Sequence, residues 1–179
     1  MSLAKQNYDD FNWVLAALQM MIDETMYHMQ TFAYTLEVHH NKKAAEIFSF
    51  VYQQFKREEE MVQSHIGNKD LPTIPPWQTV YPDYKHPSDV LSEIDYLLTQ
   101  EKAWKAIDHV SQIHMDFYNF LLTESQNSEI LSLIRELQKH SQRSKMINQK
   151  EGLKFIGQDM QRDEDLDLIP GGDFKGMFQ

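Results

Sequence analysis

The sequence predicts an all-α fold, a four-helix bundle with a long crossover between its second and third helices. Five of the six prolines fall between Ile66 and Ser88, and five of the six glycines follow residue 150. Because proline excludes helix, residues 67–87 are expected to form the crossover. Outside these breaks, apolar residues recur at the spacing of one helix face. The stretches with this spacing are 9–38, 42–66, 88–123 and 128–149.

The first two helices are expected to form an antiparallel pair, from about Asp9 to Val38 and from about Lys42 to Ile66. Asn41 is the predicted N-cap of the second helix, and Gly67 suits its C-terminus. The positions expected to face inward form one apolar stripe on each helix, and on the second helix the carboxylate of Glu58 interrupts it. They are Phe11, Leu15, Leu18, Ile22, Met29, Phe32 and Leu36, then Ala44, Phe48, Val51, Phe55, Glu58, Val62 and Ile66.

The third and fourth helices are expected to begin at the caps Ser88 and Ser128 and to end near Thr123 and Gln149. A break in the third helix is predicted between 98 and 101. Their inward positions again follow one stripe on each helix. These are Ile94, Leu97, Trp104, Ile107, Ser111, His114, Tyr118 and Leu121, then Leu131, Ile134, Leu137, Ser141, Ser144 and Ile147.

The chain divides into a bundle, 1–150, and a C-terminal arm, 151–179. The arm loses the helical periodicity and gains glycine and charge, so it is expected to be partly extended.

Composition restricts the class of protein and its partners. The net charge is −10, with 17 basic and 27 acidic residues, which disfavours nucleic acid and anionic membranes as partners. Cysteine is absent, so disulfides and thiolate metal sites are excluded. The N-terminal residues do not read as a signal peptide, and no apolar run approaches the length of a membrane span. We therefore expect a cytoplasmic protein.

Four short motifs carry a resemblance to a known family. They are LEVHHN at 36–41, AEIF at 45–48, PPW at 75–77 and DFY at 116–118. With these motifs and the helices around them, the chain resembles the ferritin-like superfamily and, within it, the rubrerythrin-type di-iron carboxylate proteins. The resemblance covers roughly Leu15 to Ile147. It implies a site in which two helices each supply a Glu and two each supply a Glu-x-x-His pair, all directed inward.

Aligned by the DFY motif, this ligand pattern falls mostly on residues that do not bind iron. Only Glu58 is a carboxylate, and it stands where the family has a His. The resemblance therefore predicts a degenerate di-iron site. The matching positions are Ile22, Phe55, Glu58, Ser111, Ser141 and Ser144.

A polar layer is predicted across the middle of the bundle, in place of the lost metal site. A buried carboxylate requires partners, so Glu58 is expected to be hydrogen-bonded, paired with His114 or protonated. One interpretation is a core without a cofactor that fixes helix register. A second is a mononuclear zinc, iron or manganese site held by Glu58, His114 and His140, and a third is a di-iron site in another register. The predicted layer comprises Glu58, Ser111, His114, His140, Ser141 and Ser144.

The missing ligands favour a non-catalytic ferritin-like binding or scaffold protein. The alternative is a metal-binding protein of oxidoreductase type, with a mononuclear or altered di-metal site. Ferritin-like proteins often pair along their first two helices, so the resemblance implies a homodimer. The aromatic residues Trp77, Tyr81 and Tyr84 of the crossover are expected at the surface, and the C-terminal arm is the predicted contact for a protein partner or a sister subunit.

Overall fold

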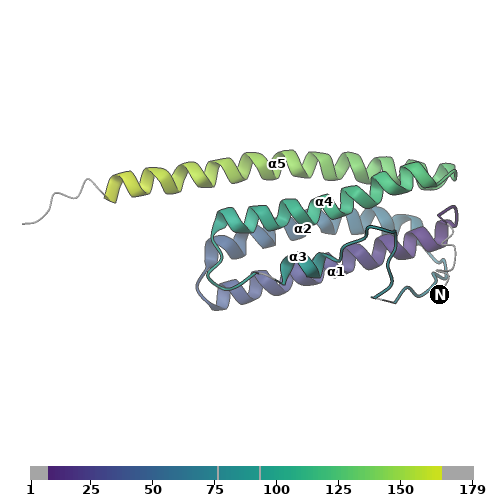
Figure 1. Cartoon of the computed structure of the whole chain (residues 1–179), viewed down its shortest axis with the longest axis horizontal. Coiled ribbons are helices and arrows are strands. Elements are labelled where there is room, and N and C mark those ends of the chain that lie inside the picture. The colour runs from purple at the N-terminus through teal and green to yellow at the C-terminus, as the bar shows by residue number, and fades with distance from the viewer. Residues whose placement is uncertain (1–7, 76, 93, 167–179) are drawn as a thin grey trace, which may run out of the picture.

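The computed structural model describes residues 8–75, 77–92 and 94–166, with side chains described as far as Lys154 (Figure 1). All regular secondary structure in these ranges is helical, which confirms the predicted all-α class. No helix among the described residues has the length and apolar character needed to cross a membrane. The five helices are α1 (Phe11–Val38), α2 (Lys42–Ile66), α3 (Pro87–Leu91), α4 (Gln100–Glu124) and α5 (Ser128–Leu166).

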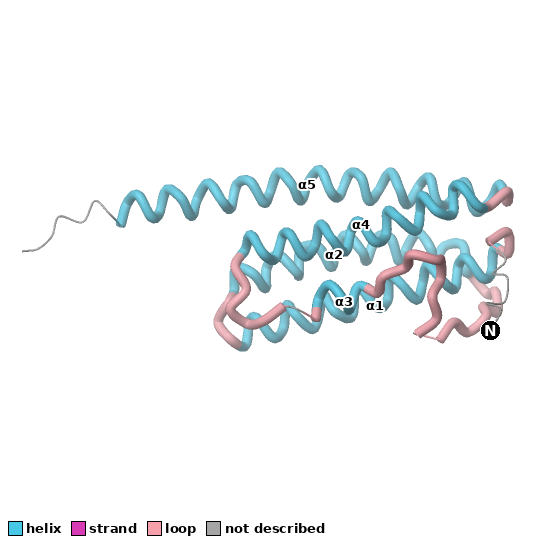
Figure 2. Tube along the Cα trace, viewed as in Figure 1, coloured by secondary structure: helices cyan, strands magenta, loops and turns pink. Residues whose placement is uncertain are grey.

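Four long helices lie side by side, and their apolar faces enclose one core (Figure 1). The pairs α1–α2 and α4–α5 share the most extensive contacts, while the short α3 lies against α1 and α4. Residues 67–86 form a long loop that connects the two pairs (Figure 2). The segment 14–18 of α1 is buried at every position, so this part of α1 is enclosed on all sides.

The first helix pair agrees with the sequence prediction. The bounds of α2 are those expected, and α1 begins two residues later than expected because Asp10 is its N-cap and accepts hydrogen bonds from the amides of Asn12 and Trp13. Gly67 ends α2 with a φ of 52°, a left-handed backbone that glycine adopts without steric cost.

Asn41 stands at the N-cap of α2, but its side chain does not cap the helix. It donates instead to the carbonyl oxygens of Tyr96 and Leu98, at 3.2 and 2.8 Å. The ring of His39 also stacks on Tyr96, with centroids 4.9 Å apart. The corner between α1 and α2 therefore holds the connection between α3 and α4 in place.

The predicted third helix is two separate helices, divided between Leu91 and Gln100. His86, not Ser88, is the N-cap of α3, in a capping box with Asp89. The dividing segment leaves the helical path, so Leu97 is 73% exposed rather than inward. Tyr81, expected at the surface, is buried against Phe117 and Phe120.

The fourth predicted helix is longer than expected and starts from another cap. Asn127, not Ser128, accepts the amide of Glu129 at 2.9 Å. The inward face is also rotated, so Ile147 is 42% exposed and Asn148 is buried. The other buried residues of this face are Ile130, Leu133, Ile134, Leu137, Ser141 and Gly152.

The first part of the predicted arm is helical, not extended, because α5 continues to Leu166. Gly152 does not end this helix. A Cβ atom at this position would lie 3.4 Å from the Trp104 indole, so the glycine allows α5 to pack closely on α4. Residues 167–179 of the arm lie outside the described part of the chain.

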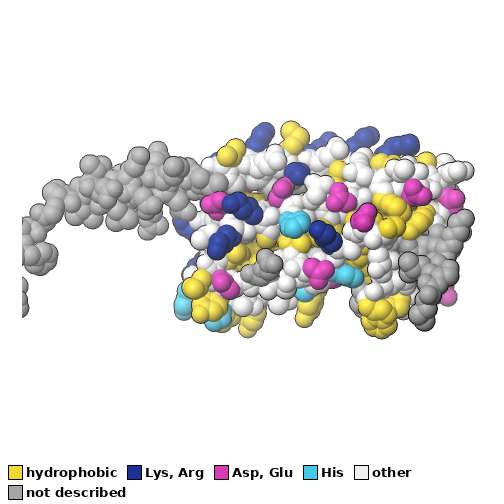
Figure 3. Space-filling view, viewed as in Figure 1, with side chains coloured by type: hydrophobic (Ala, Val, Ile, Leu, Met, Phe, Trp, Pro, Cys, Tyr) yellow, Lys and Arg dark blue, Asp and Glu magenta, His cyan; other side chains and the backbone are white. Residues whose placement is uncertain are grey.

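Lysine and arginine side chains follow one another along α5, at the upper edge of the space-filling view (Figure 3). This face of the helix is turned away from the core and carries several exposed apolar side chains as well.

Candidate polar centre and groove

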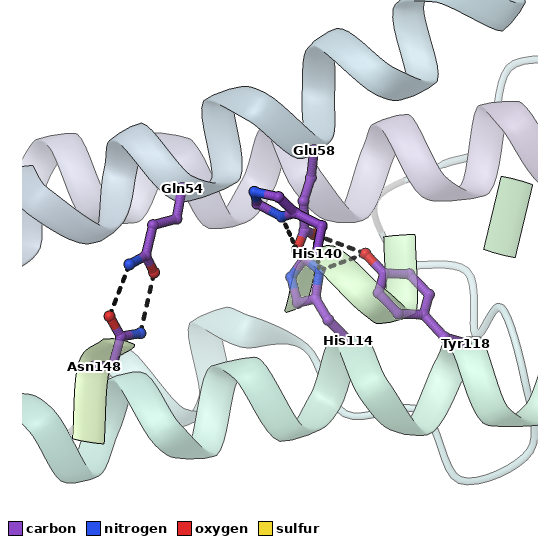
Figure 4. A network of polar contacts seen from close by, with 6 residues as sticks. All are labelled: Gln54, Glu58, His114, Tyr118, His140 and Asn148. Carbon is purple, nitrogen blue, oxygen red and sulfur yellow. Dashed lines mark hydrogen bonds and ion pairs between the residues drawn. The ribbon is translucent and has the colours of Figure 1, made fainter. Parts of the chain in front are cut away.

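A buried carboxylate lies between the helices at mid-height. Glu58 of α2 is 2% exposed. The phenol of Tyr118 donates to its Oε2 at 2.8 Å, and Nδ1 of His140 lies 3.3 Å from its Oε1 (Figure 4). Each carboxylate oxygen thus has a partner, one from α4 and one from α5.

His114 of α4 extends this cluster to α1. The ring is fully buried, and its Nε2 lies 2.9 Å from Oγ1 of Thr25. Its Nδ1 lies 3.5 Å from the Tyr118 phenol oxygen and 3.7 Å from Glu58 Oε2. A proton on Nδ1 would face these two oxygens and leave Nε2 to accept from Thr25. Residues from all four long helices therefore meet in the Glu58 cluster, which consists of Thr25, Glu58, His114, Tyr118 and His140.

Burial controls the protonation of this cluster. It lowers the pKa of His114 from 6.5 to about 4, although the nearby charges of Glu58 and Glu24 act in the opposite direction. Burial also raises the pKa of Tyr118 well above 10, and Glu58 adds to that increase. At neutral pH the imidazole of His114 and the phenol of Tyr118 are therefore both uncharged.

The predicted polar residues are brought together only in part. His114 and His140 both approach Glu58, one at each carboxylate oxygen. Ser111 and Ser141 are buried, and Ser144 is half-buried. The hydrogen-bond partners of Glu58 are Tyr118 and His140 rather than these serines.

Sequence reasoning did not assign Tyr118 or Thr25 to the site, although a positional signal existed for each. Tyr118 lies four residues after His114, and Thr25 lies three residues after the inward Ile22. Residues at these spacings share a helix face.

An amide pair lies two turns along α5 from the Glu58 cluster. Gln54 and Asn148 exchange two hydrogen bonds, of 2.8 and 3.0 Å, between α2 and α5 (Figure 4). Because Asn148 is buried, this reciprocal pairing satisfies an amide that would otherwise be costly to enclose.

The residues at the family's ligand positions do not fit a di-iron centre. Ile22 is fully buried and Phe55 is 4% exposed, with its ring 4.7 Å from that of His114. Apolar atoms thus occupy space that carboxylates would need. Among the described residues, no group of three or more His, Asp or Glu side chains has an arrangement able to hold a metal ion.

A groove of about 520 Å³ lies between α4 and α5, beside the polar centre. Its wall is mostly apolar, and Ser111 and Asn148 connect it to the buried polar residues. The indole Nε1 of Trp104 is buried and has no acceptor in the described part of the chain. The lining residues are Glu101, Trp104, Lys105, Ile107, Asp108, Ser111, Lys145, Asn148, Gln149, Gly152 and Leu153.

The charged side chains at the groove pair with one another. Lys105 contacts Glu101 at 2.6 Å, and Lys145 contacts Asp108 at 3.2 Å. The rim therefore has no excess of either charge.

Comparisons with protein families, with curated proteins and with solved structures find no match to this chain. The resemblance to ferritin-like proteins remains a prediction from the sequence motifs and the helix pattern.

The substitution Tyr118→Phe removes the hydroxyl donor of Glu58 and leaves a buried carboxylate oxygen without it. We expect a loss of about 1–3 kcal/mol in the free energy of unfolding, measured by urea denaturation. Tyr84→Phe is the matched control, because the Tyr84 hydroxyl is buried without a partner among the described residues. Equal losses in the two variants would contradict the assigned role of Tyr118.

The depressed pKa of His114 predicts a loss of stability in acid. Between pH 6.5 and about 4 the unfolded chain binds a proton at His114 and the folded chain does not, so acidification favours unfolding. The loss of stability is absent above pH 6.5 and grows to about 3 kcal/mol by pH 4. Urea denaturation across this range should show a smaller pH dependence for His114→Gln than for the natural chain.

His109→Gln serves as the control for the pH experiment, since His109 is an exposed histidine of the same helix. It should retain the pH dependence of the natural chain. If His114→Gln also retains it, another group causes the acid sensitivity.

Proposed function

We propose that this chain is a non-catalytic binding protein, built on a ferritin-like four-helix bundle that has lost its di-iron site. The loop 67–86 would be the crossover of that bundle. Its ligand would be a small, uncharged and largely apolar molecule held between α4 and α5. The observation that carries the proposal is the groove of about 520 Å³, a volume typical of small-molecule sites.

The Glu58 cluster supports a structural role for the former metal layer. Both carboxylate oxygens of Glu58 have partners, and His114 is hydrogen-bonded to Thr25. Groups that are buried and bonded to one another are not available to a substrate. Four helices contribute to the cluster, so it fixes their mutual register.

The composition of the groove indicates the class of ligand. Mostly apolar walls, with Trp104 and Ile107 on α4, favour an apolar or aromatic body. The ion pairs at the rim balance one another, which gives no preference for a charged ligand. A hydrogen-bond acceptor on the ligand would suit the unpaired indole N–H of Trp104.

Metal binding is the second candidate function, and one observation favours it. The two histidines approach opposite oxygens of Glu58, at 3.3 Å for His140 and 3.7 Å for His114. Two imidazoles and a carboxylate are sufficient protein ligands for a zinc ion that also binds water. Such a site would require Tyr118 to give up its bond to Glu58 and the three side chains to move, because their described arrangement is not one that can hold a metal ion.

The groove proposal predicts binding of a neutral aromatic probe. Titration with 1-aminoanthracene should give saturable fluorescence enhancement, with energy transfer from Trp104. Ser111→Leu extends a side chain into the base of the groove and should weaken binding at least tenfold, about 1.4 kcal/mol. Ser132→Leu, on the exposed face of α5, should leave binding unchanged. Equal affinity in both variants, with helical circular dichroism retained, would contradict the proposed site.

The two candidate functions differ in metal content. If the Glu58 cluster is structural, protein purified without added metal will contain no stoichiometric zinc, iron or manganese by elemental analysis. Adding these ions will also leave its thermal unfolding midpoint unchanged. About one ion per chain, lost in the variant Glu58→Gln, would favour the metal site instead.

A further inference from the structure

A cavity separate from the groove lies where the crossover loop meets the C-terminal half of α4 (Figure 2). Its volume is about 410 Å³, within the range of small-molecule sites. Part of its wall is aromatic, because the rings of Tyr81 and Phe120 stack there with centroids 5.3 Å apart. The α4 residues follow one another at intervals of three or four and so share one helix face. The lining residues include Tyr81 and Asp83 of the loop and Asp116, Phe120, Thr123 and Glu124 of α4.

Three carboxylates line this cavity without a compensating cation. Asp83, Asp116 and Glu124 make no ion pair with any described residue, and no described Lys, Arg or His lines the cavity. The groove differs, because its acids Glu101 and Asp108 pair with lysines. The three carboxylates are not arranged to hold a metal ion. Their negative charge therefore matches an organic cation.

Tyr81 carries an unused hydroxyl at this cavity. The residue is 6% exposed, and its hydroxyl has no hydrogen-bond partner within the described part of the chain. Burial raises the pKa of Tyr81 to about 12, and the charges of Asp116 and Asp83 contribute to this increase. Both carboxylates therefore lie near the hydroxyl. A phenol oxygen without a protein partner is free to accept a hydrogen bond from a ligand.

Most polar atoms at the cavity are acceptors. Asp116 accepts from Gln112 through Oδ1 at 2.8 Å, which leaves Oδ2 for a ligand. The Thr123 hydroxyl donates to the backbone carbonyl of Asn119 at 3.1 Å, so its lone pairs are available to a donor. A cation with several N–H groups therefore fits this cavity better than one with a single donor.

We propose that this cavity binds a guanidinium group, which lies against the aromatic rings and donates hydrogen bonds to the carboxylates. Guanidinium is planar, stacks on aromatic faces and presents five N–H donors, whereas an ammonium group is a compact point charge. The cavity is larger than this group, so an attached alkyl stem has room beside Phe120. The guanidinium belongs either to a small guanidino compound or to an arginine of a peptide, and both present the same chemistry.

The test is titration of the isotope-labelled full chain with methylguanidinium, followed through backbone amide shifts in heteronuclear correlation spectra. Amides of the residues that line the cavity should shift in a saturable way, and the affinity should fall as salt rises. N-Methylurea, an uncharged analogue of the same shape, should cause no saturable shift there. Methylammonium should bind at least tenfold more weakly, because it lacks the planar set of donors.

The double variant Asp83→Asn/Asp116→Asn should weaken methylguanidinium binding at least tenfold, because it removes two charges and keeps the side-chain size. Tyr81→Phe should weaken binding about threefold, since it removes one neutral acceptor and keeps the ring. Glu60→Gln/Glu136→Gln is the matched control, which makes the same charge change at exposed sites of α2 and α5. It should leave the affinity unchanged, and circular dichroism checks that every variant is folded.

A blocked tripeptide with a central arginine separates the two sources of the guanidinium group. Binding at least tenfold tighter than that of methylguanidinium assigns the site to a peptide, and a smaller gain assigns it to a small guanidino compound. The proposal is overturned if methylguanidinium causes no saturable shift at the cavity. It is also overturned if N-methylurea or methylammonium binds equally well, or if the double variant keeps the natural affinity.

Discussion

The burial of one carboxylate is the constraint on which the arrangement of the helices depends. Glu58 is enclosed on α2, and a carboxylate in that position is tolerated only if other groups satisfy its oxygens. Tyr118 and His140 come from α4 and α5, and His114 connects the cluster to Thr25 on α1. Sliding any of these helices by a turn would break a buried hydrogen bond. An apolar core alone would not select one register so strictly.

The sequence was sufficient to predict the long helices, because the spacing of apolar residues and the positions of the prolines are local signals. The ends of α2 and the start of the polar layer at Glu58 were predictable for the same reason. Asn41 shows where local rules stop: it has the position and chemistry of a cap, yet its Oδ1 does not cap the helix, and its Nδ2 donates to the carbonyl oxygens of residues 96 and 98. Such a contact depends on tertiary placement, which one helix's sequence does not encode.

The errors on α5 have a related cause. A helix packed on one neighbour over most of its length needs only a narrow buried face, so its apolar period is weak. Ile147 and Asn148 are adjacent, and hydrophobicity alone predicts that Ile147 faces inward, whereas Asn148 is the buried residue. Asn148 is inward because Gln54 pairs with its amide across the interface. Gly152 likewise suggested an end to the helix, but it meets the Trp104 indole and permits close packing.

The two faces of α5 therefore have different roles in the same chain. Its inner face supplies His140 to the Glu58 cluster and Asn148 and Gly152 to the groove wall. Its outer face contributes nothing to the core, yet it concentrates basic side chains in a protein with a net charge of −10. Solubility alone does not require this, since an acidic chain already repels its copies. The exposed basic residues on this face are therefore a local exception to the acidic character of the chain.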